Sequence, residues 1–593
     1  MFSSQLEQKT GVTRHSLAHI DIPCPPGNIS LVFAKFLTKF LSGKTRRAQG
    51  AAFPAAPGKI PKELLGDFEP SRLNSERPEE NPMRTKRMIT LLLVILPAAA
   101  LTFAQTPCEK LKTLSLPDTS LTAVEYVPAG PYTAPPFPGA PAAKPQPSQP
   151  LPAYCRVALV LTPTKDSHIE SEVWVPTEDW NGKLEVVGNG GWAGTISFPA
   201  MAAALRDGYA TASTDTGHKA NDGGGNGNFA LGHPEKLIDF GYRALHETTV
   251  KAKAIVAAFY RKGPQYSYYN GCSTGGRQGL VEATKFPEDF DGVIAGAPAN
   301  PHIHLHAADI ERNMELRKDP GHRLSPAKVA TLHKAVLDAC DGLDGAKDGL
   351  LADPEKCSFD PATLLCKGAD SDSCLTAPQV EAVKIAFSDV KTKKGEVIWT
   401  GFAPGGELQY TILTAAIDPN ALPPVMQLDS IRILAYQDPN WDWRTWDLDR
   451  DVALADEKGG LIDVRTYDFS AFKARGGKLL LYHGWSDPGI AAGNTVNFYK
   501  GVLSKMGAKQ DDWFRLFMVP GMQHCSGGPG PDQFNKIGVI ERWRESGAAP
   551  DQILAAHVTG GTVDMTRPLC PYPKSYAYKG SGTLTDAANF TCK

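Results

Sequence analysis

Short apolar runs of the length expected for buried strands recur along the 593-residue chain, and polar turns separate them. Helical patterns lie between several of these runs, as in residues 251–260 and 534–545. This alternation of strands and helices predicts an α/β fold in which helices pack on a sheet. The predicted strands are residues 157–161, 172–175, 183–187, 209–213, 266–269, 293–295, 478–482 and 515–519.

The alternation stops at about residue 301 and resumes with the apolar run 478–482. The stretch between them holds two cysteine pairs and a tryptophan-rich run, residues 441–446. Because it is inserted between two parts of one predicted sheet, residues 301–471 are predicted to form a lid domain. The core domain is then expected to consist of residues 105–300 and 472–593.

A candidate nucleophile, Ser273, stands in the pattern Gly271-x-Ser273-x-Gly275. This pattern has the form of a nucleophile elbow, which requires a strand before the serine and a helix after it. The aromatic run 266–269 and the helical stretch 276–284 supply that context. A chance match in a glycine-rich chain is the alternative, and the flanking elements favour the catalytic interpretation.

Cysteines stand beside two candidate catalytic residues, in Cys272-Ser273 and in His524-Cys525. A serine and a histidine that share a catalytic hydrogen bond come within about 3 Å. Their chain neighbours are then close enough for a disulfide, which needs Cα atoms roughly 4.4–6.8 Å apart. The sequence therefore predicts that a Cys272–Cys525 bond holds the nucleophile next to its base.

The third member of the predicted triad is Asp487, which follows the apolar run 478–482 by a few residues. Functional side chains collect at the carboxyl ends of strands in α/β sheets. The chain order Ser273, Asp487, His524 is the order of an α/β-hydrolase triad. His483 is the competing histidine, and its place at the strand end beside the acid favours a structural role. An ordinary turn carboxylate is the alternative for Asp487.

The oxyanion hole of such an enzyme needs backbone donors, one of them the amide of the residue after the nucleophile, here Thr274. A glycine-rich loop after the predicted strand 183–187 is the expected source of the second donor. Gly191 is the preferred residue in this loop and Gly190 is the second choice. A simple flexible turn is the alternative.

Three carboxylates occur within eight residues at Asp341, Asp344 and Asp348, with glycines between them. Oxygen ligands at short spacing on a tightly curved loop suit Ca²⁺, although the spacing is not that of an EF-hand. A solvated Asp/Gly turn is the commoner meaning of this composition. The nearby Cys340 and Cys357 indicate a constrained loop and favour the metal.

The Cys-Ser, Asp and His-Cys constellation resembles that of the tannase and feruloyl esterase family of α/β-hydrolases, in which the two cysteines are bonded. The resemblance extends from about Cys108 to Cys592. It implies a structural calcium held by the side chains of Asp341, Asp344 and Asp348 and by the carbonyls of Ala346 and Leu350. For the 11 cysteines it implies the pairs Cys108–Cys155, Cys272–Cys525, Cys340–Cys357, Cys366–Cys374 and Cys570–Cys592.

Cys24 is left without a partner by that pattern, and the N-terminal sequence offers a reason. Residues 83–104 have a basic start, an apolar middle and a small-residue end, as a secretory signal peptide does. The simplest account is that translation starts at Met83 or Met88, with residues 1–82 an unstructured or non-native extension. A membrane anchor is the alternative, but the apolar run is shorter than the ~20 residues of a span. A secreted or periplasmic protein is expected, which also fits many disulfides.

The resemblance implies a secreted serine carboxylesterase that needs no redox cofactor. Its expected substrate is a small aromatic ester, free or attached to a plant polysaccharide or polyphenol. A feruloyl esterase is preferred; a tannase or a terephthalate-monoester hydrolase is the alternative within this chemistry, and an inactive fold used for binding is the alternative outside it. The complete set of Ser273, Asp487 and His524 favours an enzyme. The formal net charge of −2 gives no reason to expect nucleic acid or an acidic membrane as a partner.

The tryptophan-rich run 441–446 could stack on a substrate ring from the lid, although tryptophans in such runs more often belong to a core. Core packing is the slightly favoured interpretation. Arg432 or Arg444 could face a substrate carboxylate, and the sequence does not distinguish between them.

Overall fold

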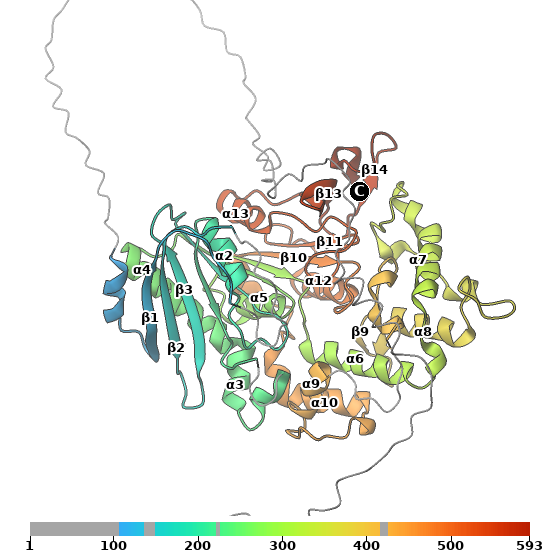
Figure 1. Ribbon diagram of the computed structural model, residues 1–593, viewed down its shortest axis with the longest axis horizontal. Helices are drawn as coiled ribbons and strands as arrows, with labels where there is room; N and C mark the ends of the chain where they lie inside the picture. The colour runs from blue at the N-terminus through green and yellow to red at the C-terminus, as the bar shows by residue number, and fades with distance from the viewer. Residues whose placement is uncertain (1–105, 136–148, 221–225, 416–424) are drawn as a thin grey trace, which may run out of the picture. The chain divides into compact units, whose positions relative to one another are not determined.

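The computed structural model describes residues 106–135, 149–220, 226–415 and 425–593 (Figure 1). A nine-stranded sheet organises these residues, with the strand order β1-β2-β3-β5-β4-β6-β7-β10-β11. The strands are β1 (Thr119–Val127), β2 (Tyr154–Leu161), β3 (Ile169–Pro176), β4 (Lys183–Val187), β5 (Ala210–Thr214), β6 (Tyr266–Cys272), β7 (Gly292–Gly296), β10 (Lys478–Gly484) and β11 (Phe514–Val519).

The sheet has an antiparallel part and a parallel part. The antiparallel pairs are β1–β2, β2–β3 and β3–β5. Every pair from β5 onward to β11 in the strand order is parallel. Parallel strands place their carboxyl ends at one edge of a sheet, so β4, β6, β10 and β11 deliver their following loops to the same edge. All eight predicted strands are present, most of them extended by a few residues. β1 was not predicted.

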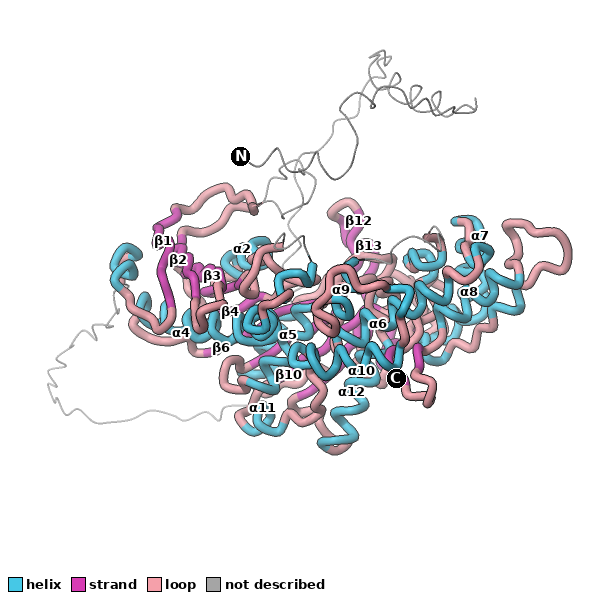
Figure 2. The backbone as a smooth tube through the Cα atoms, turned by 90° about the horizontal axis from the view of Figure 1, so that it is seen from below, coloured by secondary structure: helices cyan, strands magenta, loops and turns pink. Residues whose placement is uncertain are grey.

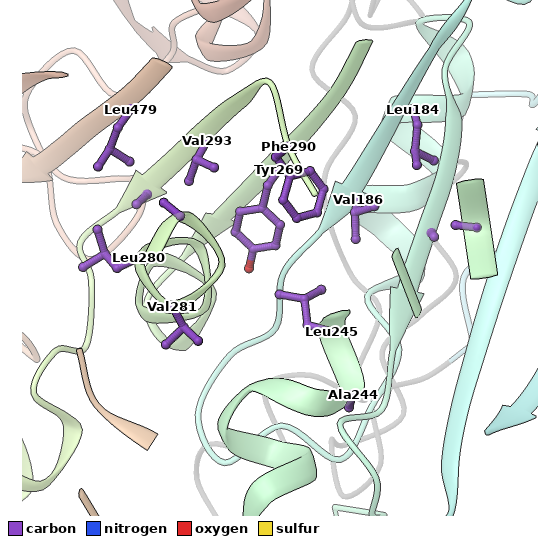
Figure 3. Close-up of a cluster of buried hydrophobic side chains, with 14 of the residues drawn as sticks. Leu184, Val186, Ala244, Leu245, Tyr269, Leu280, Val281, Phe290, Val293 and Leu479 are labelled. Atoms are coloured by element: carbon purple, nitrogen blue, oxygen red, sulfur yellow. The ribbon is translucent and has the colours of Figure 1, made fainter. Parts of the chain in front are cut away.

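Alternate residues of the central strands point to opposite faces of the sheet and form two separate cores. Tyr269 and Val293 belong to the larger core, and their chain neighbours Tyr268 and Ile294 belong to the other. Figure 3 shows the larger core, where Leu280 and other side chains of a helix pack against the strands. The strands therefore read as continuous apolar runs because both of their faces are buried.

Helices cover both faces of the sheet. α4, α5 and α12 contribute to the core that contains Tyr269, and α2 and α13 contribute to the cores on the other face. The bounds of the helices in this part of the chain are α2 (Phe198–Arg206), α3 (Pro234–Ile238), α4 (Ala244–Tyr260), α5 (Thr274–Lys285), α12 (Gly493–Met506) and α13 (Lys536–Ser546). The arrangement is that of an α/β-hydrolase.

The segment between β7 and β10 adds no strand to the large sheet. Its helices contribute to two further cores, one of which also contains Trp192 and Phe240 from the preceding part of the chain. Within the segment, α6 packs against both α9 and α10 (Figures 1 and 2). Its elements are α6 (His302–Leu316), α7 (Pro326–Cys340), α8 (Ala377–Phe387), β8 (Val390–Lys391), β9 (Val397–Trp399), α9 (Val425–Arg432), α10 (Leu448–Gly459) and α11 (Ser470–Ala474). This segment occupies the stretch that was expected to form a lid domain. The boundaries of that domain, residues 301–471, stay a prediction.

Two small hairpins follow α13, and a disulfide ties the second of them to the preceding chain. They are β12 (Ile553–Thr559) with β13 (Thr562–Leu569), and β14 (Tyr576–Tyr578) with β15 (Phe590–Cys592). No helix in the described ranges has the length and apolar character that crossing a membrane requires. The predicted N-terminal extension, the signal peptide and Cys24 lie outside the described residues.

Candidate active site

Ser273 stands at the sharp turn between β6 and α5. Its backbone has φ +66° and ψ −126°, a region that residues with a side chain rarely adopt. Its amide donates to the carbonyl of Gly296 at 3.0 Å, which anchors the turn to the neighbouring strand. A Cβ atom on Gly271 would lie 2.6 Å from the carbonyl oxygen of Gly275, so only glycine allows this close approach. The predicted elbow is therefore present in its strand-turn-helix setting.

Asp487 follows β10 and is nearly fully buried, at 1% exposure. One carboxylate oxygen, Oδ1, accepts from the amides of Gly489 and Ile490, both at 2.8 Å. The other, Oδ2, lies 2.7 Å from Nδ1 of His524, on the loop that follows β11. The predicted acid and base are thus in contact, and the acid is fixed by its own turn.

His483 provides a fourth donor to Asp487. Its Nε2 lies 3.1 Å from both Asp487 Oδ2 and the carbonyl of Ile490, while its Nδ1 lies 2.7 Å from Thr495 Oγ1. Because Nε2 faces two acceptors, this nitrogen carries the proton, and Nδ1 accepts from the threonine hydroxyl. His483 is fully buried, as a positioning role for the acid requires.

The charges of the Asp487–His524 pair stabilise one another. Burial alone would raise the pKa of Asp487, but hydrogen bonds from His483 and His524 hold it well below its usual value. Burial likewise opposes the charged form of His524, yet the hydrogen bond and the negative charge of Asp487 raise its pKa above 6.5. Asp487 therefore stays ionised, and His524 is poised to accept a proton near neutral pH.

A disulfide joins the chain neighbours of the nucleophile and the histidine. Cys272 and Cys525 are bonded with Cα atoms 6.0 Å apart, across 253 residues of chain. Ser273 and His524 also line the same cavity. The other four pairs implied by the resemblance are formed as well.

Two backbone amides near Ser273 are the candidate oxyanion donors. Thr274 is the first residue of α5, where an amide has no partner within its own helix. Gly191 lies in the loop after β4 with φ +55°, and its carbonyl accepts from Thr274 Oγ1 at 2.6 Å. In the described part of the chain, no backbone hydrogen bond of a turn or loop has the Gly191 amide as its donor. The threonine hydroxyl thus ties the glycine loop to the elbow.

The candidate catalytic residues open onto a cavity of about 350 Å³. Ser273, Thr274, His524 and Gly191 form part of its wall. Apolar side chains supply another part, from Ala299, Leu305, Phe402, Ile412 and Ile490. Polar side chains of α6 and α9 supply the rest. A cavity of this size and lining suits a small molecule with an apolar body.

The tryptophan-rich run does not line this cavity. Trp443 is buried in a core of the inserted segment, Trp441 stacks on Tyr436, and the Trp446 indole donates to Glu311 at 2.7 Å. The idea that these rings contact the substrate is therefore wrong, and the core interpretation holds. The aromatic ring in the cavity wall is that of Phe402, which no motif in the sequence singled out.

The two candidate arginines are also engaged elsewhere. Arg432 pairs with Asp429, and Arg444 pairs with Asp442. Neither side chain lines the cavity. A substrate carboxylate would meet no lysine or arginine among the residues that form this wall.

The acidic loop begins in a short 3-10 turn, Asp341–Asp344. Each carboxylate accepts from a backbone amide of the loop: Asp341 from Gly349, Asp344 from Ala346 and Asp348 from Leu350. Asp348 also pairs with the buried Arg567. Asp344 Oδ2 is buried without a hydrogen-bond partner.

Comparisons with known proteins agree with this geometry. The family model described as tannase and feruloyl esterase matches residues 155–593. This chain belongs to that family. A probable feruloyl esterase B-1 of Aspergillus flavus is 34% identical over 81% of this chain and 93% of its own length. An uncharacterized esterase of Xanthomonas campestris is 36% identical over 86% and 94%.

Solved structures of family members share the fold. Feruloyl esterase B from Aspergillus oryzae superposes with a TM-score of 0.75 at 33% identity, covering 82% of this chain and 99% of that one. The tannin acyl hydrolase from Aspergillus niger has a TM-score of 0.64 at 23% identity, covering 83% and 93%, and shows that its fold is the same. The protein is accordingly a carboxylesterase with an α/β-hydrolase fold.

Proposed function

We propose that the protein is a feruloyl esterase, which hydrolyses esters of hydroxycinnamic acids through the nucleophile Ser273. The observation that carries the proposal is the joint placement of Ser273 and His524 in one cavity, with Asp487 bonded to the histidine. The feruloyl esterase relatives support the choice of acyl group. This arrangement leaves no reason to regard the protein as an inactive fold used for binding.

The reaction follows from the roles of these groups. His524 Nε2 takes the proton of the Ser273 hydroxyl as its oxygen attacks the ester carbonyl, and Asp487 stabilises the imidazolium. The amides of Thr274 and Gly191 hold the oxyanion of the tetrahedral intermediate. The imidazolium then protonates the leaving alcohol, and an acyl-enzyme remains. Water activated by His524 cleaves the acyl-enzyme and restores the free serine.

The charge of the cavity wall favours some of the alternative substrates over others. A terephthalate monoester carries a free carboxylate, which would lie against Asp309 in a wall that offers no lysine or arginine. Like charges in a partly dehydrated site repel each other, so this substrate is disfavoured. Gallate esters carry no such charge. A tannase is therefore the second candidate.

A substrate panel tests the assignment. We expect kcat/KM to be highest for methyl ferulate, lower for methyl gallate, and lowest for an aliphatic methyl ester of similar length. A ring fixed in an apolar cavity places the carbonyl near Ser273, whereas a flexible chain must first be ordered. A preference for gallate would make the enzyme a tannase, and a preference for the aliphatic ester would contradict an aromatic substrate.

We also propose a structural Ca²⁺ in the acidic loop, held by Asp341, Asp344 and Asp348 with the carbonyls of Ala346 and Leu350. Two features of Asp344 support the ion. Asp344 has a buried carboxylate oxygen that lacks a partner. Burial, with the negative charges of Asp348 and Asp341, raises the pKa of Asp344 to about 6. A cation would relieve this repulsion, and its contribution would be to the stability of the loop.

Chelation tests the calcium proposal without reference to activity. Removing divalent cations should lower the melting temperature by several degrees, and added Ca²⁺ should restore it, because an ion that binds only the folded state stabilises it. Asp344→Asn should remove this response, whereas a change of the exposed Asp338 to Asn should preserve it. A melting temperature that ignores both chelator and Ca²⁺ would contradict the site.

We infer that the protein is exported to an oxidising compartment. Support comes from the five disulfides in the described residues, since such bonds are rare in the cytosol. The predicted signal peptide at residues 83–104 supplies a route. N-terminal sequencing of the exported protein would show whether cleavage occurs near Ala104.

A further inference from the structure

One face of helix α6 forms part of the cavity wall. His302, Leu305, His306, Asp309 and Asn313 all line the cavity, and their spacing of three or four residues places them on one side of the helix. The amide of Ala299, just before α6, donates to the carbonyl of Ser273 at 3.1 Å. The helix therefore begins beside the nucleophile, and Asp309 lies about 10 Å farther along the axis than His302, at 1.5 Å per residue.

The polar groups of this wall are incompletely satisfied. Among the described residues, Gln427 on α9 has a buried Oε1 atom without a hydrogen-bond partner, and both ring nitrogens of His302 lack one as well. The Asp309 carboxylate accepts from Gln427 Nε2 at 3.5 Å, a long contact. An ionised carboxylate can accept about four hydrogen bonds, so most of its capacity is free. Buried polar groups in folded proteins usually have partners, and a bound ligand can supply those that the described residues do not.

The surroundings define what kind of group would fit there. The rest of the wall near α6 is apolar, with Leu305, Phe402 and Ile412 among its side chains. Burial raises the pKa of Asp309 to about 6, and the nearby Arg312 opposes that effect. Above that pH Asp309 is ionised and can only accept. A partner that donates to this carboxylate and is attached to an apolar body suits this wall, and a hydroxyl group on a small substrate has both properties.

We propose that Asp309, supported by Gln427, forms a subsite that recognises a hydroxyl group of the substrate. This proposal rests on the proposed function, because the subsite would recognise a group on the ester that Ser273 cleaves. The Asp309 carboxylate accepts the hydroxyl proton, and the Gln427 amide holds the carboxylate in place. The hydroxyl belongs either to the phenol of the acyl group or to a sugar on the alcohol side. Both sources offer the same donor, and the experiment below distinguishes them.

The size of the effect follows from the chemistry of the contact. A hydrogen bond to a charged group contributes roughly 1.5–3 kcal/mol, which corresponds to about 10- to 100-fold in kcat/KM. A methoxyl group cannot donate and gains nothing from Asp309. The preference of the enzyme should therefore depend on the hydroxyl itself and not on the polarity of the ring.

The test compares substrate pairs that differ by hydroxyl groups alone. For the acyl side, methyl 4-hydroxycinnamate is compared with methyl cinnamate; for the alcohol side, a cinnamoyl sugar ester is compared with its O-methylated form, in which the sugar hydroxyls can no longer donate. We expect wild type to prefer the hydroxyl-bearing member of at least one pair by about 10- to 100-fold. Asp309→Leu should abolish that preference, and Asp309→Asn should reduce it. The pair that responds identifies the side.

The control variant is Glu381→Gln, which changes an exposed carboxylate on α8 of the same inserted segment and should keep both ratios. Methyl cinnamate turnover reports whether each variant is folded and active, because it does not use the subsite. Unchanged ratios for both pairs in active Asp309→Leu and Asp309→Asn enzymes would overturn the inference. Failure of the proposed function would be a different result, namely slow cleavage of every cinnamate ester relative to an aliphatic ester by wild type.

Discussion

Two parts of one cavity wall differ in how their polar atoms are used. Around Asp487, each carboxylate oxygen has two donors, from two amides and two histidines. On the α6 and α9 side, Gln427 and His302 hold buried polar atoms without partners. The protein itself supplies the partners of the catalytic acid, whereas the recognition wall that we propose is left for a substrate to complete. The chemistry is thus preorganised, and selectivity is left to groups that a substrate must satisfy.

The largest effect is expected from removing the nucleophile. Ser273→Ala should lower kcat by about 10⁴-fold or more, because no other group in the triad can form the acyl-enzyme. Turnover of a p-nitrophenyl ester measures the loss, and an unchanged melting temperature shows that the fold is intact. Binding on the α6 side should survive, so a competitive aromatic acid should still protect the variant against unfolding. Residual activity near that of wild type would refute the role of Ser273.

A smaller effect is expected from breaking the bond between the nucleophile and base segments. The double change Cys272→Ser with Cys525→Ser should lower kcat by about 10²-fold, because His524 loses positional restraint and displacements near 1 Å are costly. The fold should also lose about 2–4 kcal/mol of stability. The matched control is Cys366→Ser with Cys374→Ser, a half-buried bond between cysteines separated by 8 positions in the inserted segment. Equal losses of kcat in the two double variants would mean that Cys272–Cys525 acts only on stability.

The smallest effect concerns the pH profile. Because Asp487 raises the pKa of His524 above 6.5, the acid limb of kcat/KM should have its midpoint above that value. Protonated His524 cannot accept the Ser273 proton, so activity should fall about tenfold per pH unit below the midpoint. Asp487→Asn should move the midpoint to lower pH while reducing the rate. p-Nitrophenyl acetate is a suitable substrate, because it has no hydroxyl group that could bind Asp309. A midpoint below pH 6.5 in wild type would contradict the role of Asp487 in raising the pKa of His524.

The sequence predicted the reaction machinery better than the recognition wall, and the reason is physical. Ser273 and Asp487 stand at strand ends, where local turn geometry and apolar runs fix their positions. The Cys272–Cys525 pairing followed from chemistry that forces chain neighbours together. The antiparallel strand β1 was missed because its outer position exposes much of it, so it lacks a continuous apolar run.

The wall residues have no comparable local signal. Asp309 and Gln427 meet only because α6 packs on α9, more than a hundred residues later in the chain. The tryptophan run was favoured as core, and tertiary packing places Trp443 in a core. Phe402, which no local pattern marked, lines the cavity instead. The role of His483 was foreseen as structural, but its contact with Asp487 became visible only in three dimensions.

The sequence separation of 253 positions from Cys272 to Cys525 also bears on the timing of activity. A ribosome releases the serine segment long before the histidine segment, so a growing chain cannot hydrolyse an ester. Even a finished chain lacks the restraint on His524 until an oxidant has closed the bond. We therefore expect the enzyme to be least competent before this bond forms. Synthesis and catalysis would in this way be kept apart without a separate inhibitor.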